Sequence, residues 1–262
     1  MGRPPVLDSF RLDGRTALVT GGSRGLGFAM ATALAEAGAD LILVARDAES
    51  LATAARELRQ TGRTVRVVPG DVATPAGAEA AVSAALDFGT PVHVLVNNVG
   101  GRRRDEPTED MLVADWQAFF DLNLTSALVC CQMVGKGMLE RQSGSVINVT
   151  SVAGPIAIKG IGGRHYEAAK AALTSLTRSL AADWAGRGVR VNAIAPGVFD
   201  TAPNRKWFRE KLEYRGKFLD HIPMGRLGEA SEVGPAAVFL ASDASSYVTG
   251  STLVVDGGFT CW

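Results

Sequence analysis

The sequence predicts an α/β fold in which helices cover both faces of a parallel sheet. Short, uninterrupted apolar runs, typical of strands buried on both faces, alternate along the chain with longer helical patterns. This alternation favours parallel strands joined by crossover helices, and right-handed crossovers make the sheet doubly wound. The 262 residues contain no repeat, low-complexity tract or linker. We therefore expect a single domain spanning residues 1–262.

Seven strands and six helical regions are expected. The strands are at residues 15–20, 41–44, 65–68, 92–96, 145–149, 189–194 and 253–255. The helices are at residues 26–37, 48–60, from Pro75 onward, 115–140 with an interruption near Asn123, 166–185 and 231–241. Gly38 has the position of a helix C-cap, and Pro75 that of a helix N-terminus. Residues 204–220 form a charged, aromatic-bearing insert without an assigned element.

Composition narrows the class of protein. Lys+Arg and Asp+Glu both number 27, so the net charge is zero and gives no indication of a nucleic-acid partner. No apolar run approaches the ~18 residues of a membrane span, and the N-terminus lacks the apolar region of a signal peptide. Cys130, Cys131 and Cys261 lack zinc-ligand spacing and are expected to be buried free thiols. We expect a cytoplasmic protein with no metal site.

A glycine-rich turn follows the first strand and opens a helix, with the pattern Gly21-xxx-Gly25-x-Gly27. Glycines allow a tight turn and a close approach of the backbone to a pyrophosphate. The helix N-terminus adds free N–H groups and the positive end of a dipole. The turn therefore predicts a dinucleotide site that comprises Gly21, Ser23, Arg24, Gly25, Leu26 and Gly27.

Two alternatives remain for the ribose of this dinucleotide. Asp47 lies about 20 residues beyond the glycines, where a carboxylate favours a free 2′-hydroxyl and hence NAD. However, the second strand ends at Val44-Ala45, so the side chain nearest the ribose is that of Ala45 or Arg46, and Arg24 lies in the glycine turn. Two guanidinium groups can hold a 2′-phosphate in fork geometry. We favour NADP(H), with NAD as the alternative.

A phenol and an ammonium lie one helical turn apart in Tyr166-Glu167-Ala168-Ala169-Lys170. Residues i and i+4 are neighbours on one helix face. A positive charge within about 4–6 Å of a tyrosine favours the phenolate, so such a tyrosine can transfer a proton near neutral pH. The pair predicts an acid–base site.

The full set of motifs resembles a known family. In order, they are Thr20-Gly21-xxx-Gly25-x-Gly27, Asn97-Asn98-x-Gly100, Asn123, Ser151, Tyr166-xxx-Lys170 and Pro196-Gly197-xxx-Thr201. Over residues 12–258 the sequence resembles the short-chain dehydrogenase/reductase family. The runs Asn-Asn-Val-Gly-Gly-Arg-Arg and Gly-Gly-Arg-His-Tyr are similar to those of gluconate 5-dehydrogenase members. The resemblance implies a Rossmann-like fold and hydride transfer between NAD(P) and a secondary alcohol or ketone.

The resemblance also implies residue roles. Tyr166 would exchange a proton with the substrate oxygen, and Lys170 would assist it and hold the nicotinamide ribose. Ser151 would stabilise charge on the substrate oxygen, and Asn123 would hold a water that links Lys170 to solvent. Cofactor contacts are implied for Asp71, Val72, Asn97, Asn98, Gly100, Pro196, Gly197, Val198 and Thr201.

The substrate remains open at this point. A local excess of basic residues favours an anionic or polyhydroxylated substrate; these residues are Arg102, Arg103, Arg104, Lys159, Arg164, His165, Lys206 and Arg209. We expect a sugar acid or polyol. The alternatives are a 3-oxoacyl-[acyl-carrier-protein] reductase and, in another class, a non-catalytic dinucleotide-sensing module. The resemblance further implies a homotetramer or homodimer assembled through the long helices and the last strand.

Overall fold

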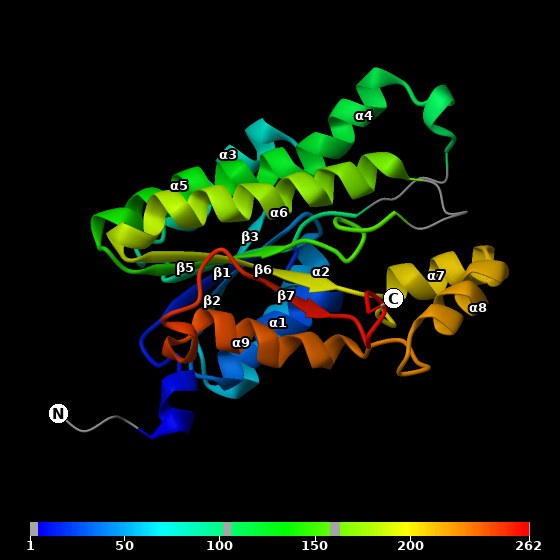
Figure 1. The fold of residues 1–262 in the computed structure, drawn as a ribbon. Coiled ribbons are helices and arrows are strands. Elements are labelled where there is room, and N and C mark those ends of the chain that lie inside the picture. Colours follow the sequence, from blue (N-terminus) through cyan, green and yellow to red (C-terminus); the bar gives the residue numbers. More distant parts are fainter. Residues whose placement is uncertain (1–4, 102–105, 158–162, 262) are drawn as a thin grey trace.

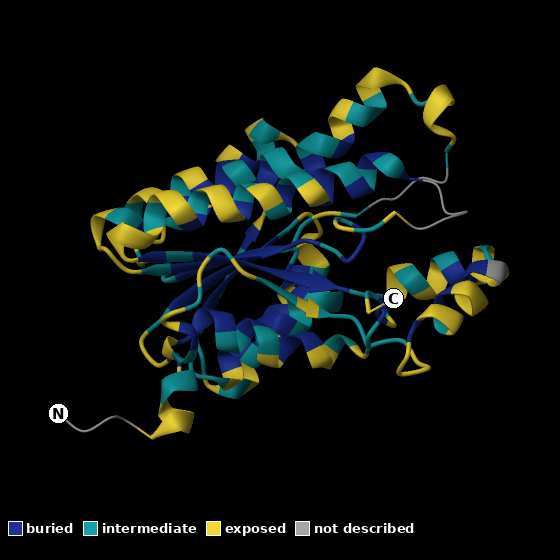
Figure 2. Cartoon of the chain, viewed as in Figure 1, coloured by how far each residue is buried: buried dark blue, intermediate teal, exposed yellow. Residues whose placement is uncertain are grey.

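The computed structural model describes residues 5–101, 106–157 and 163–261 and has three layers. A twisted sheet lies between two layers of helices (Figure 1). Its inner strands are buried, whereas the helices expose their outer faces (Figure 2). This arrangement is the predicted α/β sandwich.

Seven parallel strands form the sheet, in the order β3-β2-β1-β4-β5-β6-β7. Their bounds are β1 Thr16–Thr20, β2 Asp40–Ala45, β3 Val65–Pro69, β4 Val94–Asn97, β5 Gly144–Val149, β6 Val189–Pro196 and β7 Thr252–Val255. The predicted number and direction of strands are confirmed. The order changes direction between β1 and β4, the point at which doubly wound folds bind ligands.

Three helices pack on each face of the sheet. Helices α1 (Gly25–Glu36), α2 (Ala48–Leu58) and α9 (Gly234–Ala241) cover one face; α3 (Pro75–Leu86), α5 (Ser126–Glu140) and α6 (Arg164–Trp184) cover the other. Side chains alternate between the two cores along β1, where Ala17 and Val19 face one and Leu18 the other. All three are fully buried.

Short 3-10 turns connect several of these elements. They are at Val6–Phe10, Arg59–Thr61, Thr108–Asp110, Ala185–Arg187, Ala230–Val233 and Asp243–Ser245.

The long helix after β4 is interrupted where the sequence predicts. Helix α4 (Val113–Phe120) passes through a π-helical turn at Asp121–Thr125 into α5. Among the described residues, the run Val113–Glu140 is the one helix long and apolar enough to cross a membrane; 56% of its most apolar 18-residue window is buried inside the structure. Core helices have the same length and composition, so this is weak evidence for a membrane.

The charged insert folds into a helical pair that the sequence pattern does not predict. Helices α7 (Ala202–Glu210) and α8 (Leu212–His221) lie beyond the carboxyl end of the sheet (Figure 1). They bury a third apolar cluster, separate from the two main cores, which consists of Val152, Phe208, Tyr214, Phe218, Ile222 and Phe259. The aromatic residues of each short helix pack against those of the other. Neither helix could bury these side chains alone.

One expectation about the cysteines is wrong. Cys130 and Cys131 are buried free thiols in α5, but Cys261 is exposed. The last residues follow β7 into the α7–α8 cluster through Phe259, and Cys261 lies beyond that anchor at the surface.

Candidate active site

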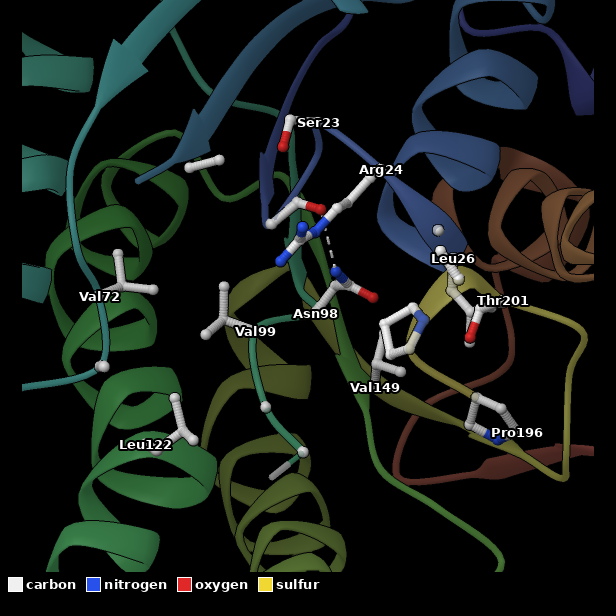
Figure 3. A pocket seen from close by; sticks show the side chains of 18 of the residues that line it. Ser23, Arg24, Leu26, Val72, Asn98, Val99, Leu122, Val149, Pro196 and Thr201 are labelled. Carbon is white, nitrogen blue, oxygen red and sulfur yellow. Dashed lines mark hydrogen bonds between the residues drawn. The ribbon is translucent and has the colours of Figure 1, made fainter. Parts of the chain in front are cut away.

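A cavity of about 450 Å³ opens at the carboxyl ends of the strands. Figure 3 shows Ser23, Arg24, Asn98, Val99 and Pro196 around it. Of the residues expected at the site, the lining includes Gly21, Ser23, Arg24, Gly25, Leu26, Arg46, Asp71, Val72, Asn98, Gly100, Ser151, Tyr166, Lys170, Pro196, Gly197 and Thr201. Motifs separated by up to 180 residues of sequence therefore border one space.

The glycine turn has the backbone that a dinucleotide requires. Gly21 and Gly25 have positive φ angles of 66° and 58°, which other residues rarely adopt. A Cβ atom on Gly27 would lie 2.2 Å from the carbonyl oxygen of Gly21, so only glycine lets α1 pack this close. No side chain caps the N-terminus of α1, so its first N–H groups can bind an anion. This turn fits a pyrophosphate.

Asn98 fastens the end of β4 to the end of β1. Its backbone N–H donates to Thr20 Oγ1 at 3.0 Å, and its side-chain amide donates to the carbonyl oxygens of Thr20 at 3.1 Å and Gly21 at 3.4 Å. These bonds fix the glycine turn against the neighbouring strand end.

The ribose end of the cavity carries charges of both signs. Arg24, Arg46, Asp47 and Asp71 all line it. Arg46 Nη1 lies 3.9 Å from Asp71 Oδ2, and both side chains are more than half exposed. The Asp47 carboxylate accepts the N–H of Ser50 at 3.0 Å and so caps α2. Hydrogen bonds to Ser50, with a smaller contribution from the Arg24 charge, lower the pKa of Asp47.

Lys170 is a buried cation at the opposite end of the cavity. Its side chain is 3% exposed, its Nζ donates to the carbonyl oxygen of Val149 at 2.8 Å, and it lies 5.9 Å from the centroid of the Tyr166 ring. Burial lowers the pKa of Lys170 to about 8. At pH 7 the ammonium form therefore still predominates.

Ser151 and Tyr166 line the same cavity as Lys170. Ser151 follows β5, and its hydroxyl oxygen accepts the N–H of Ala153 at 3.1 Å, which leaves the hydroxyl hydrogen to donate elsewhere. Tyr166 lies in the first turn of α6. A proton donor, a hydroxyl and an ammonium thus converge on one space.

Asn123 supports the site from behind without lining the cavity. In the π-helical turn it is fully buried; its Oδ1 accepts the N–H of Gly101 at 2.7 Å and its Nδ2 donates to Phe119 O at 2.9 Å. A Cβ atom on Gly100 would lie 2.8 Å from both Asn123 Oδ1 and Lys170 Nζ. Gly100 therefore separates these groups with no room for a side chain.

Other expected residues do not line this cavity. Gly27 packs behind the turn, and Val198 borders a smaller neighbouring cavity. The expectation that Asn97 lines the cofactor is wrong: its side chain points into the sheet–helix core and donates to Asn148 Oδ1 at 2.9 Å. Successive residues of a strand point to opposite faces, so Asn97 and Asn98 diverge.

The basic cluster is less uniform than its sequence suggests. Arg102–Arg104 and Lys159 lie outside the described residues. Arg164 pairs with Glu167 at 2.7 Å, His165 is fully buried against Phe119, and Lys206 lies 4.0 Å from Glu210. Arg209 lines a different cavity. Of the four described members, three are thus paired or buried and the fourth lies at another cavity.

Several lining residues belong to no motif and were not expected at the site. They include Ser50, Leu122, Val149, Thr150, Phe199 and Asn204. Most lie within a few residues of a strand end or in the π-helical turn, which is the one signal that could have identified them. Asn204 additionally depends on the placement of α7, where its amide donates to Phe199 O at 2.8 Å.

Several known proteins are similar to this chain in both fold and sequence. A family model described as enoyl-(acyl carrier protein) reductase matches residues 21–260. A galactitol 2-dehydrogenase (L-tagatose-forming) from Cereibacter sphaeroides is 44% identical over 255 residues, which cover 97% of this chain and 98% of that protein. The chain belongs to the short-chain dehydrogenase/reductase family. It is therefore an NAD(P)-dependent oxidoreductase of this family that acts on CH–OH groups.

Other members of the short-chain dehydrogenase/reductase family differ in substrate. A solved gluconate 5-dehydrogenase from Burkholderia cenocepacia J2315, in complex with NADP and tartrate, has a TM-score of 0.90 and 39% identity over 98% of this chain and all of that one. A 3-oxoacyl-[acyl-carrier-protein] reductase from Chlamydia pneumoniae is 38% identical over 95% of this chain and 98% of that protein. Similarity at this level leaves the substrate to be argued from the site.

Proposed function

We propose that this chain is an NADP(H)-dependent dehydrogenase that interconverts a secondary alcohol and a ketone on a polyol or sugar acid. The observation that carries the proposal is the shared cavity, which brings Ser151, Tyr166 and Lys170 to the same strand ends as the glycine turn. A bound nicotinamide supplies or accepts the hydride. The protein's residues bind and orient the reactants and move the proton.

The proton-transfer roles follow from placement. Tyr166 exchanges a proton with the substrate oxygen, and Lys170 favours the phenolate through its charge. The Ser151 hydroxyl donates to the same substrate oxygen and stabilises negative charge that develops there. A module that only senses dinucleotide has no need for these three groups in one cavity, which disfavours that alternative.

Gly100 and Asn123 act as positioning residues for Lys170. Asn123 holds the backbone of Gly101 on both sides, since it accepts from the N–H and donates to the carbonyl oxygen at 3.3 Å. The adjacent Gly100 backbone lies directly against the lysine. We propose that Asn123 also orders the water through which Lys170 communicates with solvent.

The cofactor preference is proposed from the charges at the ribose end. Arg24 and Arg46 both line the cavity, and the Asp47 carboxylate is engaged in capping α2. Two guanidinium groups can clamp a 2′-phosphate. The related gluconate 5-dehydrogenase from Burkholderia cenocepacia was solved with NADP. These points support NADP over NAD. Asp71 and Val72 are proposed to contact the adenine, and Pro196, Gly197, Val198 and Thr201 the nicotinamide end.

The ratio of kcat/KM values for NADP⁺ and NAD⁺ tests this preference. Arg46→Ala and Arg24→Ala should each lower the ratio about tenfold or more, because a hydrogen bond to a charged group contributes about 1.5–3 kcal/mol. Arg56→Ala, an exposed arginine on α2 outside the cavity, serves as the control. An unchanged ratio in both cavity variants would show that NADP is not held there.

The substrate class is proposed from the reaction end of the cavity. Among the described lining residues the cations are Arg24, Arg46 and Lys170, and only Lys170 lies with Ser151 and Tyr166. A neutral polyol fits these walls because it carries no carboxylate that would need a further cation. A sugar acid requires a further cation, for which Arg102–Arg104 and Lys159 are the candidates in the sequence.

A turnover panel separates these substrates. With NADP⁺, kcat/KM is compared for galactitol and gluconate; with NADPH, for 5-ketogluconate and an acetoacetyl thioester. We expect turnover of the polyol or sugar acid. Activity on the thioester alone would establish the acyl reductase instead. If gluconate is the substrate, replacing Arg102, Arg103 and Arg104 together by alanine should lower its kcat/KM and spare that of galactitol.

The remaining proposals concern assembly and location. We propose that residues 1–262 act as one NAD(P)-binding domain and form a homotetramer or homodimer in the cytoplasm. Strand β7 lies at the edge of the sheet with Val254 44% exposed, and Tyr247 nearby in sequence is fully exposed. Edge strands with apolar residues favour pairing with another chain.

A further inference from the structure

A second large cavity, of about 610 Å³, lies against helices α7 and α8 and shares no lining residue with the first. Helix α7 borders both. Its first turn, with Ala202, Pro203 and Asn204, lines the dinucleotide cavity, whereas Arg205, Phe208 and Arg209 line the second one. We call this second cavity the arginine groove, after Arg205, Arg209, Arg215 and Arg226 in its walls.

The arginine groove is basic on a protein that has no net charge. Four arginines face two lining carboxylates, Asp200 and Glu229, whereas the whole chain has 27 residues of each sign. An excess of one sign of charge in a groove raises the local concentration of the opposite ion. The charge of the groove is therefore a local property and does not follow from composition.

Two of the four arginines are already neutralised. Arg205 lies 3.3 Å from Asp200, and Arg226 binds both carboxylate oxygens of Glu232, at 2.7 and 2.8 Å. The bond to Arg226 is the main reason that the pKa of Glu232 is lowered to about 2. Arg205 and Arg226, which form part of the groove wall, therefore already have carboxylate partners.

The other two arginines, Arg209 on α7 and Arg215 on α8, make no ion pair or hydrogen bond with any residue that the structure describes. They project into one groove from two adjacent helices. Like charges on neighbouring helices repel, and an anion bound between them would remove the repulsion and join the helices.

We propose that the arginine groove binds a small multivalent oxyanion, such as a phosphorylated or polycarboxylated metabolite, held by Arg209 and Arg215. Guanidinium forks bind phosphate and carboxylate oxygens in pairs. The volume suits a small organic ligand, and Leu212, Leu219 and Leu227 offer an apolar wall for its carbon skeleton. Both carboxylates of the groove are engaged, since Asp200 pairs with Arg205 and the Glu229 side chain accepts the backbone N–H of Glu232 in a capping box.

Binding in the arginine groove is linked to the dinucleotide cavity through α7. An anion that joins Arg209 to Arg215 fixes α7 on α8, and thereby fixes the first turn of α7 that lines the other cavity. Linkage is reciprocal, so the anion and the dinucleotide should change each other's affinity by the same factor.

Isothermal titration calorimetry with pyrophosphate and with citrate tests the proposal. The protein is first saturated with NADP⁺, so that neither anion can occupy the glycine turn. We expect binding to the wild-type protein and at least tenfold weaker binding to the Arg209→Ala/Arg215→Ala double variant. The control is Arg56→Ala/Arg187→Ala, which removes two exposed arginines outside both cavities. Circular dichroism and NADP⁺ affinity verify that each variant is folded.

Three outcomes would overturn the proposal. The first is no binding of either anion to the wild-type protein at about 10 mM, a concentration that would largely fill a site with a Kd of about 1 mM. The second is equal affinity in the Arg209/Arg215 variant and the control. The third is binding of polyglutamate but of neither small anion, which would indicate an acidic protein partner. None of these depends on turnover, so they are distinguishable from a failure of the proposed function.

Discussion

At the reaction end of the cavity, burial changes the pKa of a single residue, Lys170. Lys170 is buried, and its ammonium donates a hydrogen bond to a neutral carbonyl oxygen, that of Val149. Desolvation lowers its pKa without a carboxylate to restore it. The lysine therefore remains a cation at neutral pH but loses its proton just above that range.

This burial predicts a pH-dependent stability. The folded pKa of Lys170 is about 8 and lies below its ordinary value of 10.5, so the unfolded state binds more protons between these two values. Stability due to this group therefore rises with pH across that window. Between pH 7 and 9.5 the apo protein should gain about 2 kcal/mol of unfolding free energy relative to Lys170→Met. Urea denaturation of both proteins at the two pH values measures this gain; parallel changes would contradict it.

Replacing Tyr166 by phenylalanine removes only the exchangeable proton. Turnover should fall at least about 10²-fold, because the variant lacks the acid–base group. NADPH affinity should remain within a few-fold, since the ring and the glycine turn are unchanged. Steady-state kinetics and fluorescence titration measure the two quantities. Full activity in the variant would mean that another group transfers the proton.

At the scale of elements, helix termini divide their work between stability and binding. The N-terminus of α1 has no side-chain cap, whereas that of α2 is capped by Asp47 and that of α3 by Thr74. Of these three helices, the uncapped α1 begins in the glycine turn, and the missing cap keeps its N–H groups available to an anion.

The cap on α2 gives a prediction that separates two roles of Asp47. If the carboxylate serves mainly as an N-cap, Asp47→Ala should lower the melting temperature by about 2–4 °C. The same variant should leave kcat/KM for NAD⁺ unchanged within twofold. Thr74→Ala removes the equivalent cap on α3, at a residue that does not line the cavity, and is the matched control. A selective loss of NAD⁺ turnover in Asp47→Ala would instead place the ribose hydroxyls on this carboxylate.

At the scale of the whole molecule, β7 forms an edge of the sheet on which an apolar side chain is exposed. Because β7 is that edge and Val254 is exposed there, we expect Val254→Arg to reduce the oligomeric state. Light scattering after size exclusion should then show a smaller species than the wild type. Val6→Arg, at an exposed position in the first 3-10 turn, should leave the wild-type state intact. A wild-type monomer would exclude the proposed assembly.

The sequence by itself determined the layered fold, the seven parallel strands and the interrupted helix at Asn123. This was possible because buried strands, glycine turns and helix N-termini depend on residues that are close together in the sequence. It also selected Ser151, Tyr166 and Lys170, whose motifs the structure gathers around one cavity.

Only the tertiary structure decided which neighbours share a space. The Asn97 side chain points into the core, whereas that of Asn98 lines the cavity. Arg164 forms an ion pair with Glu167, and residues 204–220 lie in two helices that border a separate groove. The physical reason is that strand faces, ion pairs and the docking of short helices depend on contacts between distant segments. Such contacts leave no periodic signal along the chain.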